Sequence, residues 1–71
     1  MRYTISTNIN GRWQFITEEG ELTDDASAWG VLKGSQSELE ANKREFLLRE
    51  GISEEKAIED EIEFMIENWK E

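Results

Sequence analysis

The sequence contains no cysteine, histidine or proline. Without cysteine and histidine there is no disulfide framework, no zinc site of the usual nitrogen and sulfur type, and no Ser-His-Asp or Cys-His catalysis. The longest apolar run, Phe46-Leu47-Leu48, is far below the roughly 20 residues that span a bilayer, and the N-terminus lacks the apolar core of a secretory signal. We therefore expect a cytoplasmic protein that uses no metal and no cofactor.

Basic residues are scarce as well. The chain has 8 lysines and arginines against 17 acidic residues, so its formal net charge is −9 over 71 residues. Nucleic-acid phosphates and anionic membranes are bound by lysine and arginine, so we expect this chain to bind neither directly. The complementary partner is a basic surface on another protein.

The length predicts one small domain over residues 1–71. A chain this short buries only about 60% of its unfolded surface and is marginally stable. The three tryptophans, three phenylalanines and one tyrosine offset a lean apolar share of 37%, since each ring can bury roughly 150–250 Å². We expect dense aromatic packing or self-association to supply the stability.

The N-terminal segment is typical of a β-hairpin, with strands over about 2–8 and 12–18 on either side of Asn10-Gly11. A loop of three residues, with Gly11 as a bulge, would pair Asn8 with Arg12. We predict this register because it gathers apolar side chains on one sheet face. Those side chains are Tyr3, Ile5, Trp13 and Phe15.

The next segment is ambiguous. We expect a third antiparallel strand over about 29–33, because an isolated hairpin is marginal in water; a short helical turn over 24–29 is the alternative. A helix over about 36–50 follows, because Ser35 and Ser37 each have a glutamate three residues on, and Gly51 can end the helix in a left-handed conformation.

A second helix is predicted over about 54–70, with Ser53 as its N-cap. Its apolar residues recur at helical spacing and would form one buried stripe. The fold class is then α+β: an antiparallel β-hairpin or three-stranded sheet, followed by a two-helix hairpin packed on one sheet face. The members of the stripe are Ile58, Ile62, Met65, Ile66 and Trp69.

The charge is concentrated in this second predicted helix, since residues 53–71 hold eight acids and two bases. On a helical wheel Glu59, Asp60, Glu63 and Glu67 share the face opposite the apolar stripe, with Phe64 beside them. One interpretation is a docking face with an aromatic anchor. The other is an ordinary solvated face with Phe64 in the core.

A secondary partner-binding region is expected in the loop after the hairpin. Acidic pairs there could in principle perform acid–base chemistry, but such chemistry needs a carboxyl group buried in a cleft. A calcium-binding loop pattern is missing too, so we expect no enzymatic activity. The loop residues are Glu18, Glu19, Glu21, Asp24 and Asp25.

These observations support a small non-enzymatic inhibitor or regulator that occupies a basic, nucleic-acid-binding surface of a protein partner. In size and net charge the chain resembles small acidic inhibitors encoded by bacteriophages, among them DNA-mimic antirestriction and anti-CRISPR proteins. That resemblance rests on composition and transfers no site residue. The alternative is a structural homodimer or accessory subunit that associates through Leu48, Ile16 or Phe64.

Overall fold

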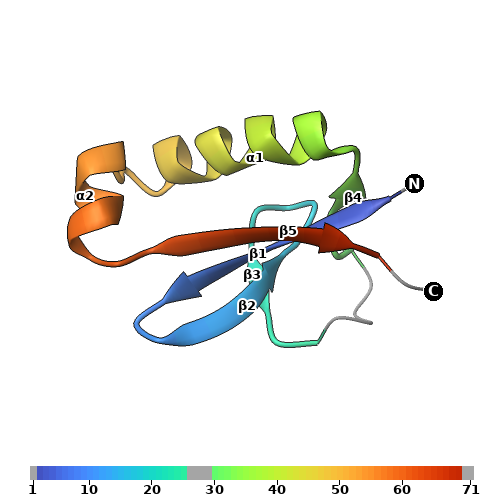
Figure 1. Cartoon of the computed structure of the whole chain (residues 1–71), viewed down its shortest axis with the longest axis horizontal. Helices are drawn as coiled ribbons and strands as arrows, with labels where there is room; N and C mark the ends of the chain where they lie inside the picture. The colour runs from blue at the N-terminus through green and yellow to red at the C-terminus, as the bar shows by residue number, and fades with distance from the viewer. Residues whose placement is uncertain (1, 26–29, 70–71) are drawn as a thin grey trace.

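The computed structural model describes residues 2–25 and 30–69, which form a curled antiparallel β-sheet with two helices (Figure 1). The N-terminal strands precede the helices, which confirms the predicted α+β class. Neither helix in these residues is long and apolar enough to cross a membrane. In chain order the elements are β1 (Tyr3–Ile9), β2 (Arg12–Ile16), β3 (Leu22–Thr23), β4 (Lys33–Gly34), α1 (Gln36–Arg49), α2 (Glu54–Glu59) and β5 (Glu63–Asn68).

Strand β1 is the centre of the sheet. Strand β5 pairs with it along one edge, from Tyr3 to Asn8. The other edge is shared by β2 near the hairpin and by β4 at Tyr3 and Thr4. Strand β3 extends the sheet beyond β2, so β5 and β3 lie on opposite sides of β1.

The hairpin turn has two residues, and the predicted three-residue loop is wrong. Ile9 pairs with Arg12, and both Asn10 (φ 56) and Gly11 (φ 81) are left-handed, as a type I′ turn requires. This register sends Ile16 to the face that carries Ile5, where both side chains are fully buried.

The register also separates the four aromatic and apolar residues that were expected on one face. Ser6 pairs with Phe15 and Asn8 with Trp13, so both rings lie on the face opposite Ile5. The prediction failed because it assumed that the side chains of the hairpin form the core by themselves. In the structure α1 and β5 supply much of the core instead.

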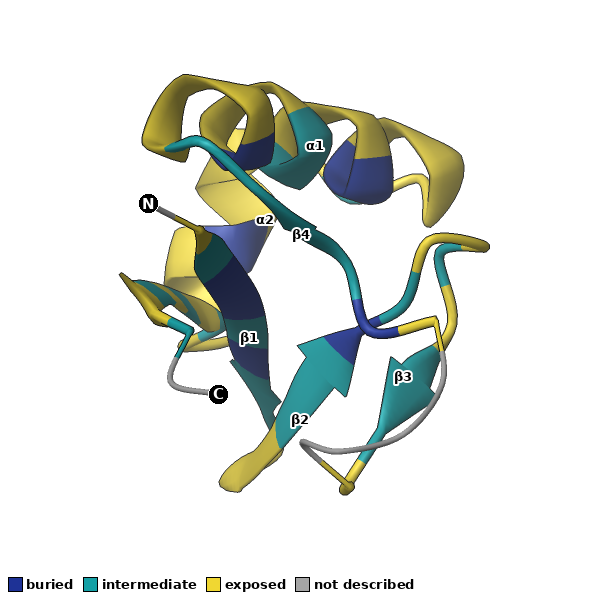
Figure 2. Ribbon diagram, turned by 90° about the vertical axis from the view of Figure 1, so that its right-hand side faces the viewer, coloured by how far each residue is buried: buried dark blue, intermediate teal, exposed yellow. Residues whose placement is uncertain are grey.

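Helix α1 covers the Ile5 face of the sheet, and its buried side is turned toward β1 (Figure 2). Its start is a capping box. The Ser35 hydroxyl accepts a hydrogen bond from the Glu38 N–H, and the Glu38 carboxylate accepts one from the Ser35 N–H. At its end Gly51 (φ 70) is left-handed and the Ile52 N–H donates to the Leu47 carbonyl at 2.9 Å. These caps confirm the predicted helix. Ile5, Ile16, Leu39 and Phe46 form the buried core beneath it.

The second predicted helix, over 54–70, is wrong beyond its first turns. Helix α2 ends at Glu59, and Glu61 (φ 55) takes the left-handed position of a Schellman cap. Its N–H donates to the Ile58 carbonyl at 3.2 Å, while the Ile62 N–H donates to the Ala57 carbonyl at 2.9 Å. The chain then reverses into β5, so the second helix of the expected hairpin is short. Lys70, the last residue of that prediction, lies outside the described residues.

The third strand is found in part. Strand β4 is Lys33–Gly34, and Val31 forms an isolated bridge with Thr17. The start of the predicted strand at Trp29, and most of the alternative helical turn, lie outside the described residues. The short strand β3 was not predicted, because its two residues lie within a segment rich in turn-forming and acidic residues.

The cap at Glu61 gives a test that separates the observed turn from a continuous helix. We expect Glu61→Gly to raise the free energy of unfolding by roughly 0.5–1 kcal/mol. The left-handed conformation costs a non-glycine residue about 1–2 kcal/mol, and the freedom of glycine in the unfolded chain offsets part of that gain.

Urea unfolding followed by tryptophan fluorescence measures the effect. The matched control is Glu45→Gly within α1, which should lose about 1 kcal/mol as glycine does in a helix interior. A similar loss for Glu61→Gly would contradict the turn and favour a helix through this position.

Candidate protein-interaction surface

The α2–β5 segment carries most of the net negative charge of the chain. Between residues 54 and 67 there are seven acidic residues and a single base, Lys56. All seven are exposed, and we call them the acidic surface. They are Glu54, Glu55, Glu59, Asp60, Glu61, Glu63 and Glu67.

Little of this charge is neutralised internally. The Lys56 ammonium lies 4.0 Å from a Glu59 carboxylate oxygen and 3.5 Å from one of Asp60. These pairs are exposed, so each contributes at most about 1 kcal/mol. Within residues 2–25 and 30–69, Glu63 and Glu67 make no ion pair. The segment therefore keeps a strongly negative outer surface.

The carboxylates are arranged differently from the predicted helical row. Glu59 and Asp60 belong to the end of α2, whereas Glu63 and Glu67 are on β5. Since residues four apart in a strand share a face, these two glutamates point to the side away from α1, about 13 Å apart along the strand. The prediction that all four carboxylates lie on one helix face is therefore wrong, because Glu63 and Glu67 belong to a strand.

Phe64 points the other way and is not an exposed anchor. Its ring meets that of Phe46 edge-on, with the centroids 6.1 Å apart. The Lys43 ammonium lies 5.3 Å from the same ring centroid, within the range of a cation–π contact. Phe64 therefore packs against the core from β5, as the alternative interpretation of this residue expected.

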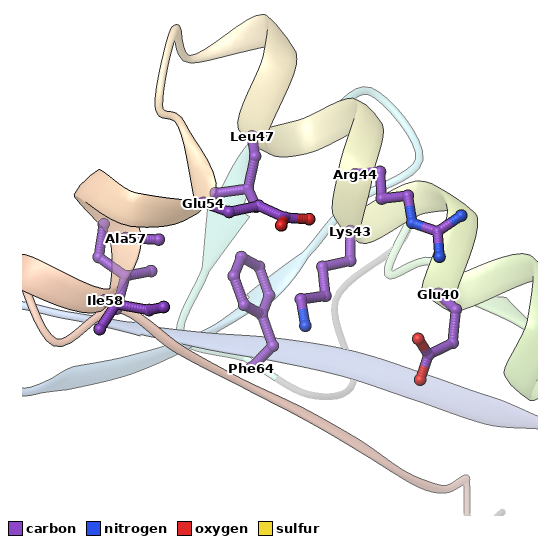
Figure 3. A pocket seen from close by; sticks show the side chains of 9 residues that line it. Glu40, Lys43, Arg44, Leu47, Glu54, Ala57, Ile58 and Phe64 are labelled. Carbon is purple, nitrogen blue, oxygen red and sulfur yellow. The ribbon is translucent and has the colours of Figure 1, made fainter.

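A groove opens beside Phe64, with α1 above it, α2 to its left and β5 below it (Figure 3). Its volume is about 360 Å³. We call it the α1–β5 groove. Its apolar lining is Leu47, Ala57, Ile58, Ile62 and Phe64, and its charged lining is Glu40, Lys43, Arg44 and Glu54.

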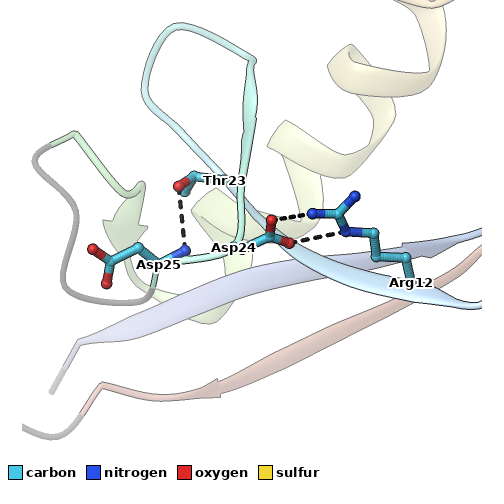
Figure 4. A network of polar contacts seen from close by, with 4 residues as sticks. All are labelled: Arg12, Thr23, Asp24 and Asp25. Atoms are coloured by element: carbon cyan, nitrogen blue, oxygen red, sulfur yellow. Dashed lines mark hydrogen bonds and ion pairs between the residues drawn. The ribbon is translucent and has the colours of Figure 1, made fainter.

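The secondary acidic region lies at the opposite edge of the sheet from β5. The Arg12 side chain donates to both carboxylate oxygens of Asp24, and the Asp25 N–H donates to the Thr23 hydroxyl (Figure 4). Asp24 is thus occupied within the protein. Glu18, Glu19 and Glu21 are exposed near the β2–β3 turn, across β1 from the acidic surface.

The predicted buried stripe is not a stripe in the structure. Ile58 is 78% exposed and Met65 38% exposed, because α2 and β5 turn their residues in different directions. Ile62, Ile66 and Trp69 are half-buried, and the Lys33 ammonium lies 4.2 Å from the centroid of a Trp69 ring. The contacts made by Lys33 and Lys43 were missed, since nothing in the local sequence predicts them.

Exposed apolar side chains also bear on association between chains. Leu48 is 80% exposed on α1, whereas Ile16 is fully buried. Of the three residues expected to mediate a homodimer, Leu48 is therefore the one with a free side chain. Ile58, at the edge of the α1–β5 groove, joins it as an exposed aliphatic residue.

Within residues 2–25 and 30–69, no three acidic side chains are gathered as a metal ion would require. Comparison of the chain with protein-family models, with curated proteins and with solved structures finds no match.

The position of Phe64 predicts a structural effect. Phe64→Ala should lower the free energy of unfolding by about 2 kcal/mol, because it removes the contact with Phe46 and part of the core margin. Chemical unfolding of the purified variant measures this loss. Phe64→Leu, which keeps most of the apolar volume, should lose less than half as much. Wild-type stability in Phe64→Ala would mean that the ring does not pack on the core.

Proposed function

We propose that this chain is a small non-enzymatic inhibitor or regulator that docks its acidic surface on a basic surface of a protein partner. The observation that carries the proposal is the seven exposed carboxylates of residues 54–67, with Lys56 as the one base among them. The overall charge of −9 has the same sign and adds to their field.

The negative charge of such a surface affects how fast it meets a partner and which partner it selects. At physiological salt an exposed charge is felt over about 8 Å, so the Glu59 and Asp60 carboxylates, which both lie beside the Lys56 ammonium, reinforce one another. A clustered field of one sign accelerates the encounter with an oppositely charged surface and selects against acidic partners. The acidic surface therefore favours a partner rich in lysine and arginine.

Protein surfaces that bind nucleic acid have this basic character. A chain that covers such a surface would keep the nucleic acid away, which is how an acidic protein of this size would inhibit. Its carboxylates are more widely spaced than DNA phosphates, which follow one another about every 1.7 Å of helix axis. The match to DNA would thus lie in the sign of a patch rather than in a regular track of charges.

A second candidate function is a structural module that forms a homodimer or joins a larger assembly. The exposure of the aliphatic side chains of Leu48 and Ile58 favours it, because burying apolar surface drives association. In that case the acidic surface would serve solubility alone.

Neutralising the acidic surface should abolish partner binding. We compare Glu59→Gln, Glu63→Gln and Glu67→Gln in one chain with a control that changes the exposed residues Glu38, Glu45 and Glu50, which belong to neither acidic region, to glutamine. Both variants remove three negative charges from a net −9. Pull-down from a lysate, followed by affinity measurement with the captured protein, gives the readout.

We expect the control to retain the partner and the acidic-surface variant to lose it. The affinity of the wild type should also fall steeply between low and moderate salt, because the attraction is between exposed charges. Equal loss in both variants would show that only net charge matters. Affinity indifferent to salt would reject the electrostatic mechanism.

The second candidate predicts self-association that depends on apolar contacts. If it holds, light scattering should give a mass above 8.3 kDa that rises with concentration, and Leu48→Asp with Ile58→Asp should return it to one chain. Leu48→Met is the control that keeps an apolar side chain. A mass of one chain at all concentrations would exclude the homodimer.

A further inference from the structure

Among residues 2–25 and 30–69, one edge of β5 is free of other strands, and Phe64 of this strand lines the α1–β5 groove. We propose that an extended basic segment of a protein partner pairs with this edge as an added β-strand, with apolar side chains alternating between the basic ones. The inference rests on the proposed function and names the manner in which the acidic surface binds.

The first observation is the unpaired backbone of β5. Among residues 2–25 and 30–69, β5 pairs with β1 and with no other strand. The Trp69 N–H donates to the Arg2 carbonyl at 2.9 Å, and backbone groups along an antiparallel strand alternate in direction. The N–H groups of Phe64, Ile66 and Asn68 therefore point to the free edge, where they can bind an added strand.

The second observation is the alternation of side chains along β5. Glu63, Met65 and Glu67 lie on the outer face of the sheet, while Phe64 and Ile66 lie on the face toward α1. Neighbouring strands place their side chains in register on each face. An added strand would thus set its outer residues beside two carboxylates and its inner residues beside two apolar side chains.

The third observation is the place of the groove. Its lining comes from α1, α2 and residues 62 and 64, and Phe64 rises into it from β5 (Figure 3). An inner-face side chain of an added strand would enter beside that ring. The volume of about 360 Å³ exceeds the roughly 150 Å³ that accommodates a benzene ring, so a large apolar side chain fits.

Charge decides which strand binds. A second copy of β5, paired antiparallel about Met65, would place Glu63 directly opposite Glu67 twice. Like charges in that position are destabilising, whereas opposite charges on facing strands are favourable. The occupant favoured by Glu63 and Glu67 is therefore a strand with lysine or arginine at the two matching positions.

The test uses the full chain and a synthetic heptapeptide that alternates lysine and valine, beginning and ending with lysine. The control peptide has the same composition, with its valines in one block. Titration followed by NMR gives the affinity, and amide hydrogen exchange reports on the backbone. We expect the alternating peptide to bind at least about tenfold more tightly, because only it can present one basic face and one apolar face.

Exchange at Phe64, Ile66 and Asn68 should slow at least about tenfold with the alternating peptide, since these amides gain acceptors. Glu63→Gln with Glu67→Gln should weaken binding about three- to tenfold, whereas the control Glu45→Gln with Glu50→Gln, on the exposed side of α1 and at its end, should not. Equal binding of the two peptides, no measurable binding, or unchanged exchange at these three amides would overturn strand addition.

The outcomes distinguish the two proposals. A captured partner that depends on the acidic surface and on salt, combined with unchanged exchange at the β5 amides, leaves the proposed function in place and rejects strand addition. Protection of the β5 amides by the peptide, without any partner lost on neutralising the acidic surface, supports the edge site and rejects the proposed function.

Discussion

The antiparallel pairing of β5 with β1 is the interaction on which the rest of this structure depends. It joins segments from opposite ends of the chain, with Tyr3 opposite Asn68 and Asn8 opposite Glu63. It also places β1 in the middle of the sheet, so that Ile5 becomes fully buried beneath α1. Without β5, only the hairpin and α1 would form the core, and less apolar surface would be buried on folding. A chain this short is marginally stable, so that loss would destabilise it.

The same pairing fixes the chemistry of the surface. As the outermost strand on its side, β5 sends Phe64 and Ile66 to the core margin and leaves Glu63 and Glu67 in solvent. Charged residues on an edge strand discourage association with other sheets in general. Here they are all of one sign and follow the carboxylates of α2 in the chain, so under the proposed function they would favour a basic partner.

Local signals in the sequence identified α1 but could not identify β5. The capping box at Ser35 and the glycine at residue 51 specify where α1 begins and ends. The segment after Glu59 has no such glycine, because Glu61 occupies the left-handed position itself. Ile62, Phe64 and Ile66 alternate as in a strand, while Ile58, Ile62 and Met65 recur as in a helix. Pairing with β1, which is almost the whole chain away in sequence, favours the strand over the helix.

The candidate site, too, could be predicted from the sequence only in part. The sequence identified which residues carry the charge, since the charge of these side chains does not depend on the backbone conformation. The burial of Phe64, the groove beneath α1 and the free edge all follow from long-range packing, which sequence periodicity does not contain. Two signals in the sequence indicated that the segment was not a helix, the odd position of Phe64 on the helical wheel and the alternation of Ile62, Phe64 and Ile66.

The most direct test of the account is an NMR measurement of contacts between β1 and β5 in the free protein. The structure predicts a strong cross-strand NOE between the α-protons of Ile5 and Ile66, with extended-chain chemical shifts over residues 63–68. Consecutive amide–amide NOEs and helical shifts through those residues would contradict it, and with it the arrangement of the acidic surface.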